Sequence, residues 1–113
     1  MDRQGVIIMD TEGKIRLFTP VAEDLLGWRA EQVTGLSCEV VFDCRDPDER
    51  SLCARCGLRL ALQRQAITPP TLMRMEDPAG QRRDMEVSFW YLPPCGQAYQ
   101  PRLMAVLNRA GLE

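Results

Sequence analysis

Hydrophobic residues alternate with polar ones, or run together, in five short stretches of the chain, and such stretches are typical of β-strands. The first is the apolar run VIIM at residues 6–9, and the second is a largely alternating stretch from residue 15 to residue 18. Between them, the sequence DTEG at residues 10–13 has the polar and glycine residues of a tight turn. The pattern therefore predicts a β-hairpin in the first part of the chain.

A second hairpin is predicted in the later half of the chain. The turn sequence DPAG at residues 77–80 separates the stretch 71–75 from the stretch 85–91. Four residues of the later stretch share one face at a period of two, namely Met85, Val87, Phe89 and Tyr91. Residues 103–107, LMAVL, are apolar on both faces, and we therefore expect this fifth strand in the middle of a sheet.

The segment between these two groups of strands has helical patterns. Thr19 offers a hydroxyl N-cap, Pro20 stands at the first helical position, and Gly27 ends this predicted helix. Its apolar face is formed by Val21, Ala22, Leu25 and Leu26. Residues 30–33 provide one or two further turns, and residues 53–65 predict a longer helix that ends before two consecutive prolines.

The predicted order is two strands, several helices and three strands. Neither group of strands can bury an apolar face alone, so we expect one antiparallel five-stranded sheet with the short helices packed on one of its faces, an α+β fold. A length of 113 residues fits a single domain over residues 1–113, with residues 110–113 interpreted as a tail or a vector-derived scar.

Charge and composition exclude several classes of partner. The net charge is −2, the pI is about 5.2, and the arginines are scattered among acidic residues, so we expect no nucleic-acid partner. No apolar run approaches the roughly 20 residues that cross a bilayer, so we expect no membrane contact by this domain. Residues 1–4 lack the regions of a signal peptide. We therefore expect a cytoplasmic location, where structural disulfides are rare.

Four of the five cysteines are clustered with the spacing C-x5-C-x8-C-x2-C, as Cys38, Cys44, Cys53 and Cys56. Four thiolates that include a C-x-x-C pair are the ligands that tetrahedral zinc or an iron–sulfur cluster requires, and two ligands three residues apart can hold one metal without backbone distortion. These four residues are therefore the candidate metal ligands. An oxygen-labile cluster would be absent from protein that has been handled in air.

Other roles for the cysteines stay open. Cys38 could pack in the core as a small apolar residue, while Cys53 and Cys56 act as a reversible thiol switch or as ordinary thiols. A thiol–disulfide oxidoreductase that uses Cys53 and Cys56 is a further alternative, although a polar loop precedes the pair where such enzymes have a strand. Cys95 lies outside the spacing and is interpreted as a loop thiol. The chain has no histidine, no G-x-S-x-G and no phosphate-binding glycine loop, so we expect no catalytic residues.

The order and spacing of these motifs resemble a PAS domain. The segment GVIIMDTEGKIRLFTPVAEDLLGWRAEQVTGLSCEVVF has the family's apolar strand, D-x-x-G turn and second strand, with TPVAE where the family usually has N-P-A-A-E. The motif G-(Y/W)-x-x-E-E-(V/L)-x-G is then matched by Gly27, Trp28, Glu31, Val33 and Gly35. The segments MEDPAGQRRDMEVSFWYLP and PRLMAVLNRAGLE resemble the last three strands, so the resemblance covers nearly the whole chain.

The resemblance implies a sensory and dimerising module within a larger bacterial signalling protein, such as a histidine kinase or a cyclase. It implies a homodimer, an effector domain beyond the carboxyl end of the chain, and a signal that is redox state, oxygen or a small-molecule ligand. Some PAS sensors carry a cysteine-ligated iron–sulfur cluster. The alternative is a structural PAS dimerisation unit that binds no ligand. An exposed Trp90 on the outer face of the sheet would support dimerisation.

The resemblance also implies a pocket between sheet and helices, for which Trp28, Phe89 and Tyr91 are the candidate lining residues. Core packing is the alternative role for these aromatic side chains. Haem is not expected, because the chain has no histidine ligand. Flavin is not expected either: Cys38 stands where the light-sensing members have their reactive cysteine, but Ser37 and Glu39 replace the flanking asparagine and arginine.

Overall fold

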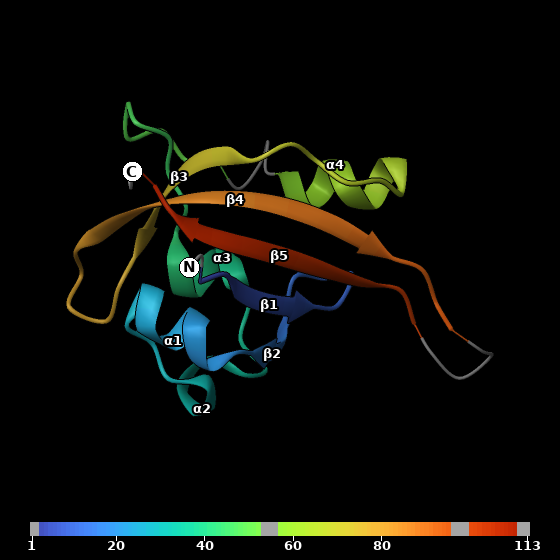
Figure 1. Ribbon diagram of the computed structural model, residues 1–113, viewed down its shortest axis with the longest axis horizontal. Helices are drawn as coiled ribbons and strands as arrows, with labels where there is room; N and C mark the ends of the chain where they lie inside the picture. The colour runs from blue at the N-terminus through green and yellow to red at the C-terminus, as the bar shows by residue number, and fades with distance from the viewer. Residues whose placement is uncertain (1–2, 53–56, 96–99, 111–113) are drawn as a thin grey trace.

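The computed structural model describes residues 3–52, 57–95 and 100–110 (Figure 1). Along the chain its elements are β1 (Gly5–Met9), β2 (Ile15–Phe18), α1 (Pro20–Leu26), α2 (Ala30–Val33), α3 (Cys38–Phe42), α4 (Gly57–Arg64), β3 (Thr71–Glu76), β4 (Arg82–Leu92) and β5 (Arg102–Arg109). The strands form one sheet in the order β2-β1-β5-β4-β3, and every neighbouring pair is antiparallel. The first and the last strands are therefore neighbours in the middle of the sheet.

One face of the sheet carries the hydrophobic core. Along β1, β4 and β5, buried side chains alternate with more exposed ones, as the period of a strand requires. Each of the four helices adds buried residues to this face, among them Leu26 of α1, Val33 of α2, Phe42 of α3 and Ala61 of α4. The helices therefore cover one face and leave the other face of the sheet more exposed.

The turn between β1 and β2 is held by the side chain of Asp10. Its Oδ1 atom accepts hydrogen bonds from the backbone N–H groups of Glu12 (2.9 Å) and Lys14 (3.0 Å), and its carbonyl accepts one from Gly13 (3.0 Å). Burial raises the pKa of Asp10, but the hydrogen bonds from Lys14, Glu12 and Arg16 outweigh it, so this pKa lies below its ordinary value. The turn therefore holds Gly13 in a fixed position beside α3.

The turn between β3 and β4 is built in the same way around Asp77, which is 6% exposed. Its Oδ1 atom accepts hydrogen bonds from the backbone N–H groups of Ala79 (3.0 Å) and Gln81 (2.9 Å), and its Oδ2 atom accepts one from Arg83 (3.1 Å). Arg83 also donates to the carbonyl of Leu25, at 2.9 Å. The turn is thereby tied to the end of α1.

The structure confirms the predicted α+β fold, both hairpins, α1 with its Thr19 cap, and the central place of the last strand. Some elements differ from the prediction. Helix α3 was not predicted, and β4 and β5 extend beyond the predicted residues 85–91 and 103–107. The predicted helix over residues 53–65 is present as Gly57–Arg64, while residues 53–56 lie outside the described part of the chain. Within the described ranges, no helix has the length and hydrophobicity needed to span a membrane.

Candidate functional site

A cavity of about 240 Å³ lies between the β1–β2 turn, α3 and α4. It is lined by Thr11, Glu12, Gly13, Ser37, Cys38, Glu39, Cys44, Leu58, Arg59, Leu62 and Gln63. Two of the four clustered cysteines, Cys38 and Cys44, therefore open onto the same cavity, and both are partly buried. They stand at opposite ends of α3, since Cys38 is its first residue and Cys44 follows its C-cap.

Cys38 is positioned by the start of α3 and by the β1–β2 turn. Ser37 caps the helix, because its hydroxyl accepts a hydrogen bond from the N–H of Glu39 (3.3 Å). The N–H of Cys38 donates to the carbonyl of Gly13 at 2.9 Å. A Cβ atom added to Gly13 would lie 3.6 Å from Sγ of Cys38, so the thiol lies beside the turn.

Cys44 begins a loop that is joined to the edge of the sheet. Its carbonyl accepts a hydrogen bond from the N–H of Leu52 (2.9 Å), which closes the loop. The next residue, Arg45, exchanges two backbone hydrogen bonds with Arg74 of β3, at 2.9 and 2.7 Å. The cysteine loop thus pairs like a short strand with β3, and the backbone on both sides of Cys44 is held.

Asp43, the residue before Cys44, lies at the centre of an ion-pair network. Its Oδ2 atom accepts hydrogen bonds from Arg82 (2.9 Å) and Arg45 (3.1 Å). The hydrogen bond from Arg82 is the main reason that the pKa of Asp43 lies below its ordinary value; partial burial opposes the shift and Arg45 adds to it. The same contact is the first cause that raises the pKa of Arg82. Both groups are therefore charged at neutral pH.

The start of α4 forms the other side of the cavity. A Cβ atom at Gly57 would lie 2.7 Å from Cδ2 of Phe89, so glycine lets the backbone approach β4 closely. Leu58 and Arg59 of the first turn then line the cavity. Cys53 and Cys56, which precede Gly57 in the sequence, lie outside the described residues. In residues 3–52, 57–95 and 100–110, no three His, Cys, Asp or Glu side chains are grouped to hold a metal ion.

The aromatic residues predicted to line a pocket are not among the residues that line the 240 Å³ cavity. Trp28 packs against the core and donates from Nε1 to the carbonyl of Glu76 at 2.9 Å. Phe89 is buried beside Gly57, and Tyr91 is partly buried on the same face of β4. The residues that line the 240 Å³ cavity come from other elements. Cys95 is exposed in the loop after β4.

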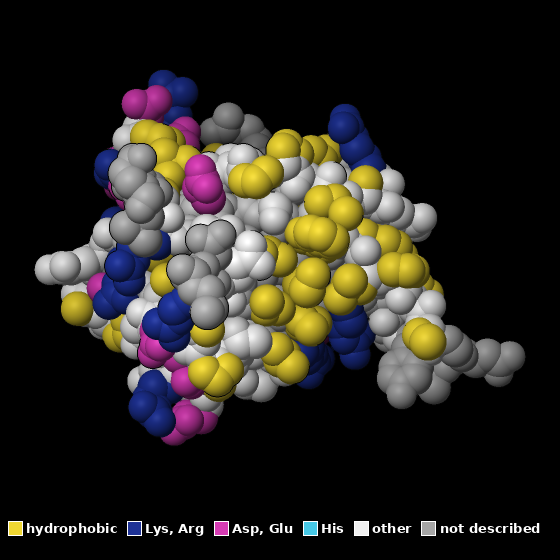
Figure 2. Space-filling view, in the orientation of Figure 1, with side chains coloured by type: hydrophobic (Ala, Val, Ile, Leu, Met, Phe, Trp, Pro, Cys, Tyr) yellow, Lys and Arg dark blue, Asp and Glu magenta, His cyan; other side chains and the backbone are white. Residues whose placement is uncertain are grey.

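The outer face of the sheet carries a row of apolar side chains from successive strands. In the register of the sheet, Leu17 pairs with Ile8, Ile8 with Met104, and Met104 with Trp90. Ile67 adds a bridge to Trp90. Directly paired residues project from the same face, so these five residues form one row, which we call the outer apolar row. Trp90 is 37% exposed and Leu17 is 45% exposed. Figure 2 shows hydrophobic side chains gathered over the sheet on the face toward the viewer.

Comparison with solved structures identifies the fold. The PAS domain of the Cronobacter turicensis quorum-sensing receptor RpfR, in complex with BDSF, matches at a TM-score of 0.67 and 14% identity, covering 97% of this chain and 96% of that chain. The PAS domain of nitrogen regulation protein NR(II) from Vibrio parahaemolyticus matches at a TM-score of 0.72 and 18% identity, covering 94% and 88%. The PAS-B domain of Drosophila melanogaster Cycle, with bound ethylene glycol, matches at a TM-score of 0.74 and 11% identity, covering 92% and 97%.

No protein-family model and no curated protein sequence matches the chain. The structural matches alone identify the fold, and they agree over nearly the whole length of the chain. The protein therefore has the fold of a PAS domain.

The sequence pattern indicated the candidate cysteines but not the residues that position Cys44. Asp43, Arg45 and Arg82 form the network beside Cys44, and the sequence places Arg82 in a polar stretch that looks like an ordinary turn. The one available signal for α3 was Ser37 at an N-cap position before an apolar run. No sequence pattern indicated that Arg82 reaches a residue 39 positions earlier in the chain.

Proposed function

We propose that this chain is a sensory PAS module of a larger bacterial signalling protein located in the cytoplasm. The module would pass the state of its cysteine cavity, the 240 Å³ cavity onto which Cys38 and Cys44 open, to an effector domain in the same protein. A histidine kinase or a cyclase is the kind of effector that we propose. The PAS fold supports this proposal, because structurally similar domains come from a quorum-sensing receptor and a nitrogen regulation protein. The module itself would be non-catalytic.

The observation that carries the proposal is that Cys38 and Cys44 open onto one cavity. The helix that follows Cys53 and Cys56 in the sequence also lines this cavity, through Leu58 and Arg59. We propose that the four thiolates bind one iron–sulfur cluster or one zinc ion, and that loss or oxidation of the metal group is the signal. Four thiolates leave a net charge of −2 around zinc(II) or an oxidised four-iron cluster, and the Arg59 guanidinium would lower the cost of this charge.

Metal analysis of protein purified without oxygen tests this proposal. We expect about one zinc, or four iron and four sulfide with a visible absorption band, per chain. Serine variants of Cys38, Cys44, Cys53 and Cys56 should each lose the metal, whereas Cys95→Ser should retain it as the matched control. Wild-type protein that contains neither zinc nor iron, even after reconstitution with both metals, would contradict a metal site.

A second candidate function is dimerisation without a ligand, and the outer apolar row favours it. Five apolar side chains lie across the sheet, and Trp90 and Leu17 are substantially exposed. Burial of such a row in a homodimer would remove apolar surface from water at about 25 cal/mol per Å². If the protein dimerises but binds neither a metal nor a small molecule in the cavity, its function would be that of a structural dimerisation unit.

A further inference from the structure

The position of Cys44 depends on how α3 ends. Asp43, the C-cap of α3, has φ 42° and ψ 57°, which is the left-handed conformation. A residue with a Cβ atom adopts this conformation at a cost of about 1–2 kcal/mol, and although aspartate tolerates it better than most residues, contacts from the surrounding structure help to hold it there. If Asp43 changed conformation, Cys44 would be the first residue to move, because the chain direction after α3 is set at Asp43.

Arg82 of β4 holds Asp43 through two different groups. Its Nη1 atom donates to the backbone carbonyl of Asp43 at 2.6 Å, and its Nη2 atom donates to the carboxylate at 2.9 Å. Arg82 is partly buried, with a side chain that is 23% exposed. A planar guanidinium can make both bonds at once, whereas a lysine ammonium has no such fixed fork. The two bonds therefore fix both the backbone and the side chain of Asp43.

Arg82 is itself held in place, because its backbone lies in the β3–β4 ladder. Arg82 pairs with Glu76 in the register of the sheet, and their side chains are within 3.6 Å. Arg45, on the other side of Cys44, is paired with Arg74 of the same hairpin. The hairpin therefore holds both neighbours of Cys44 by contacts that are 39 and 29 residues apart in the sequence.

We propose that Arg82 is the positioning residue of the cysteine cavity, and that it directs the Cys44 thiol into the cavity through its two hydrogen bonds to Asp43. The significance of this role for sensing rests on the proposed function, but the position of the thiol can be measured without any metal. Arg82 acts through Asp43 and has no role as a ligand.

Residue-resolved alkylation of the reduced, metal-free chain tests the proposal. Iodoacetamide rates at Cys44, Cys38 and Cys95 would be measured by mass spectrometry for the wild type, R82Q, R82K and R83Q. In R82Q we expect alkylation of Cys44 to be on the order of tenfold faster. Loss of the charge-assisted hydrogen bonds to Asp43 would let the segment around Cys44 open more often, and the thiol would then be exposed to the reagent. R82K should also react faster than the wild type, because lysine keeps the charge but loses the fork.

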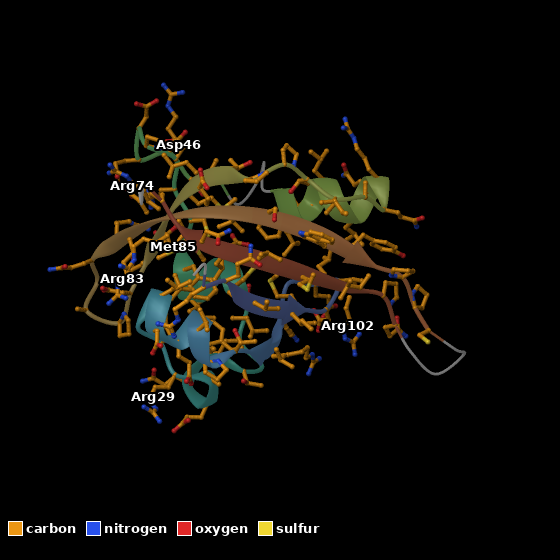
Figure 3. All side chains as sticks on the ribbon, viewed as in Figure 1. Arg29, Asp46, Arg74, Arg83, Met85 and Arg102 are labelled. Carbon is orange, nitrogen blue, oxygen red and sulfur yellow. The ribbon has the colours of Figure 1, made fainter. Side chains whose placement is uncertain are left out.

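R83Q is the matched control. Arg83 is the next residue of β4, and it likewise binds one carboxylate, that of Asp77, and one carbonyl, that of Leu25. Figure 3 shows Arg83 at the same end of the molecule as Arg74. R83Q should leave the Cys44 rate within about twofold of the wild type, because Arg83 binds Asp77 and Leu25. A general loss of stability of about 1 kcal/mol would instead change the alkylation rates of all the cysteines alike. Equal Cys44 rates in R82Q and R83Q would overturn the proposal.

Two further measurements keep the outcome decisive. If R82Q does not fold, which circular dichroism would show, D43N takes its place, because it weakens the hydrogen bonds that Arg82 and Arg45 donate to this carboxylate and leaves both arginines intact. For protein loaded with Zn²⁺, R82Q should release the metal to a chelator faster than R83Q does. Wild-type protein that takes up no metal would remove the proposed metal site and leave the alkylation result valid. Metal binding with equal behaviour of R82Q and R83Q would remove the role of Arg82 alone.

Discussion

Gly13 lines the cysteine cavity and Asp43 directly precedes Cys44, which also lines it; both residues have positive φ angles, of 86° and 42°. Glycine adopts this region without steric cost, whereas Asp43 is stabilised there by hydrogen bonds from Arg82 and Arg45. The two cysteines are thereby held in different ways: Cys38 contacts a turn that its sequence already favours, and Cys44 follows a residue that a distant arginine stabilises. This difference explains why the sequence indicated the Asp10–Gly13 turn and gave no sign of the Asp43 conformation.

Gly13→Ala should lower the free energy of unfolding by about 1 kcal/mol, because alanine disfavours positive φ. Its new methyl group would lie 3.6 Å from Sγ of Cys38, and we therefore expect slower alkylation of Cys38. Gly80→Ala is the matched control: Gly80 has φ 83° and no atom within 4 Å of an added Cβ. Urea denaturation and alkylation rates check both variants. Slower Cys38 alkylation in Gly80→Ala as well would show that the cavity contact is not responsible.

Helix α3 carries the cysteine site and is an element that the hydrophobic pattern did not predict. It is five residues long, too short for an apolar period to be recognised, and its ends are set by Ser37 and by the contacts of Asp43. The hairpins were predictable because their turn residues and alternating strands act locally. The β3–β4 hairpin also supports the cysteine loop from a distance, which its own sequence does not reveal.

The turn of the β3–β4 hairpin should make stability depend on acidic pH through Asp77. Hydrogen bonds to its carboxylate, first that from the N–H of Gln81, lower the pKa of Asp77 below its ordinary value of 3.8, and Arg83 adds to the lowering. A lowered pKa in the folded state stabilises the protein above about pH 3.8, and this contribution is lost as the pH falls through the folded-state pKa. The difference in the free energy of unfolding between the wild type and D77N should therefore be largest at neutral pH.

Urea denaturation of the wild type and D77N between pH 7 and the acid range measures this difference. It should become smaller below about pH 4, because the wild type then loses the stabilisation that D77N already lacks. Asp48→Asn, in an exposed position of the cysteine loop, serves as the control for the loss of an acidic side chain outside the β3–β4 turn. A D77N difference that stays constant through the acid range would show that the charged form of Asp77 is not favoured by folding.

The five strands, the two hairpins and their union in one antiparallel sheet could be predicted from the sequence, whereas the full strand order and the geometry of the site could not. Two early and three late strands can bury their apolar faces in few ways, so alternation and turn residues were sufficient for the fold. The convergence of Cys38 and Cys44 on one cavity depends on α3, and the anchoring of Cys44 depends on Arg82 and Arg74. These contacts join residues far apart in the chain, for which a single sequence carries no local pattern.

The outer apolar row makes assembly of the whole molecule testable. Met104 lies in the central strand, between Ile8 and Trp90, so Met104→Glu places a charge in the middle of the row. If the homodimer forms through this face, we expect Met104→Glu to be monomeric at concentrations where the wild type is dimeric, because a charge buried without a partner is strongly unfavourable. Analytical ultracentrifugation measures the two states. Leu60→Glu, at an exposed position on α4, should remain dimeric; its dissociation to the same extent would place the interface elsewhere.

The central position of β5 has a consequence for how the protein forms during synthesis. The β1–β2 hairpin and the β3–β4 hairpin each depend on neighbouring residues, but they do not pair with each other, because β5 lies between them (Figure 1). While a ribosome is still translating the segment before Arg102, the nascent polypeptide lacks the strand that joins the two hairpins, so their apolar sides have no shared partner. Completion of the sheet therefore waits for the final strand, and the half-made chain presents unpaired strand edges that chaperones would have to protect.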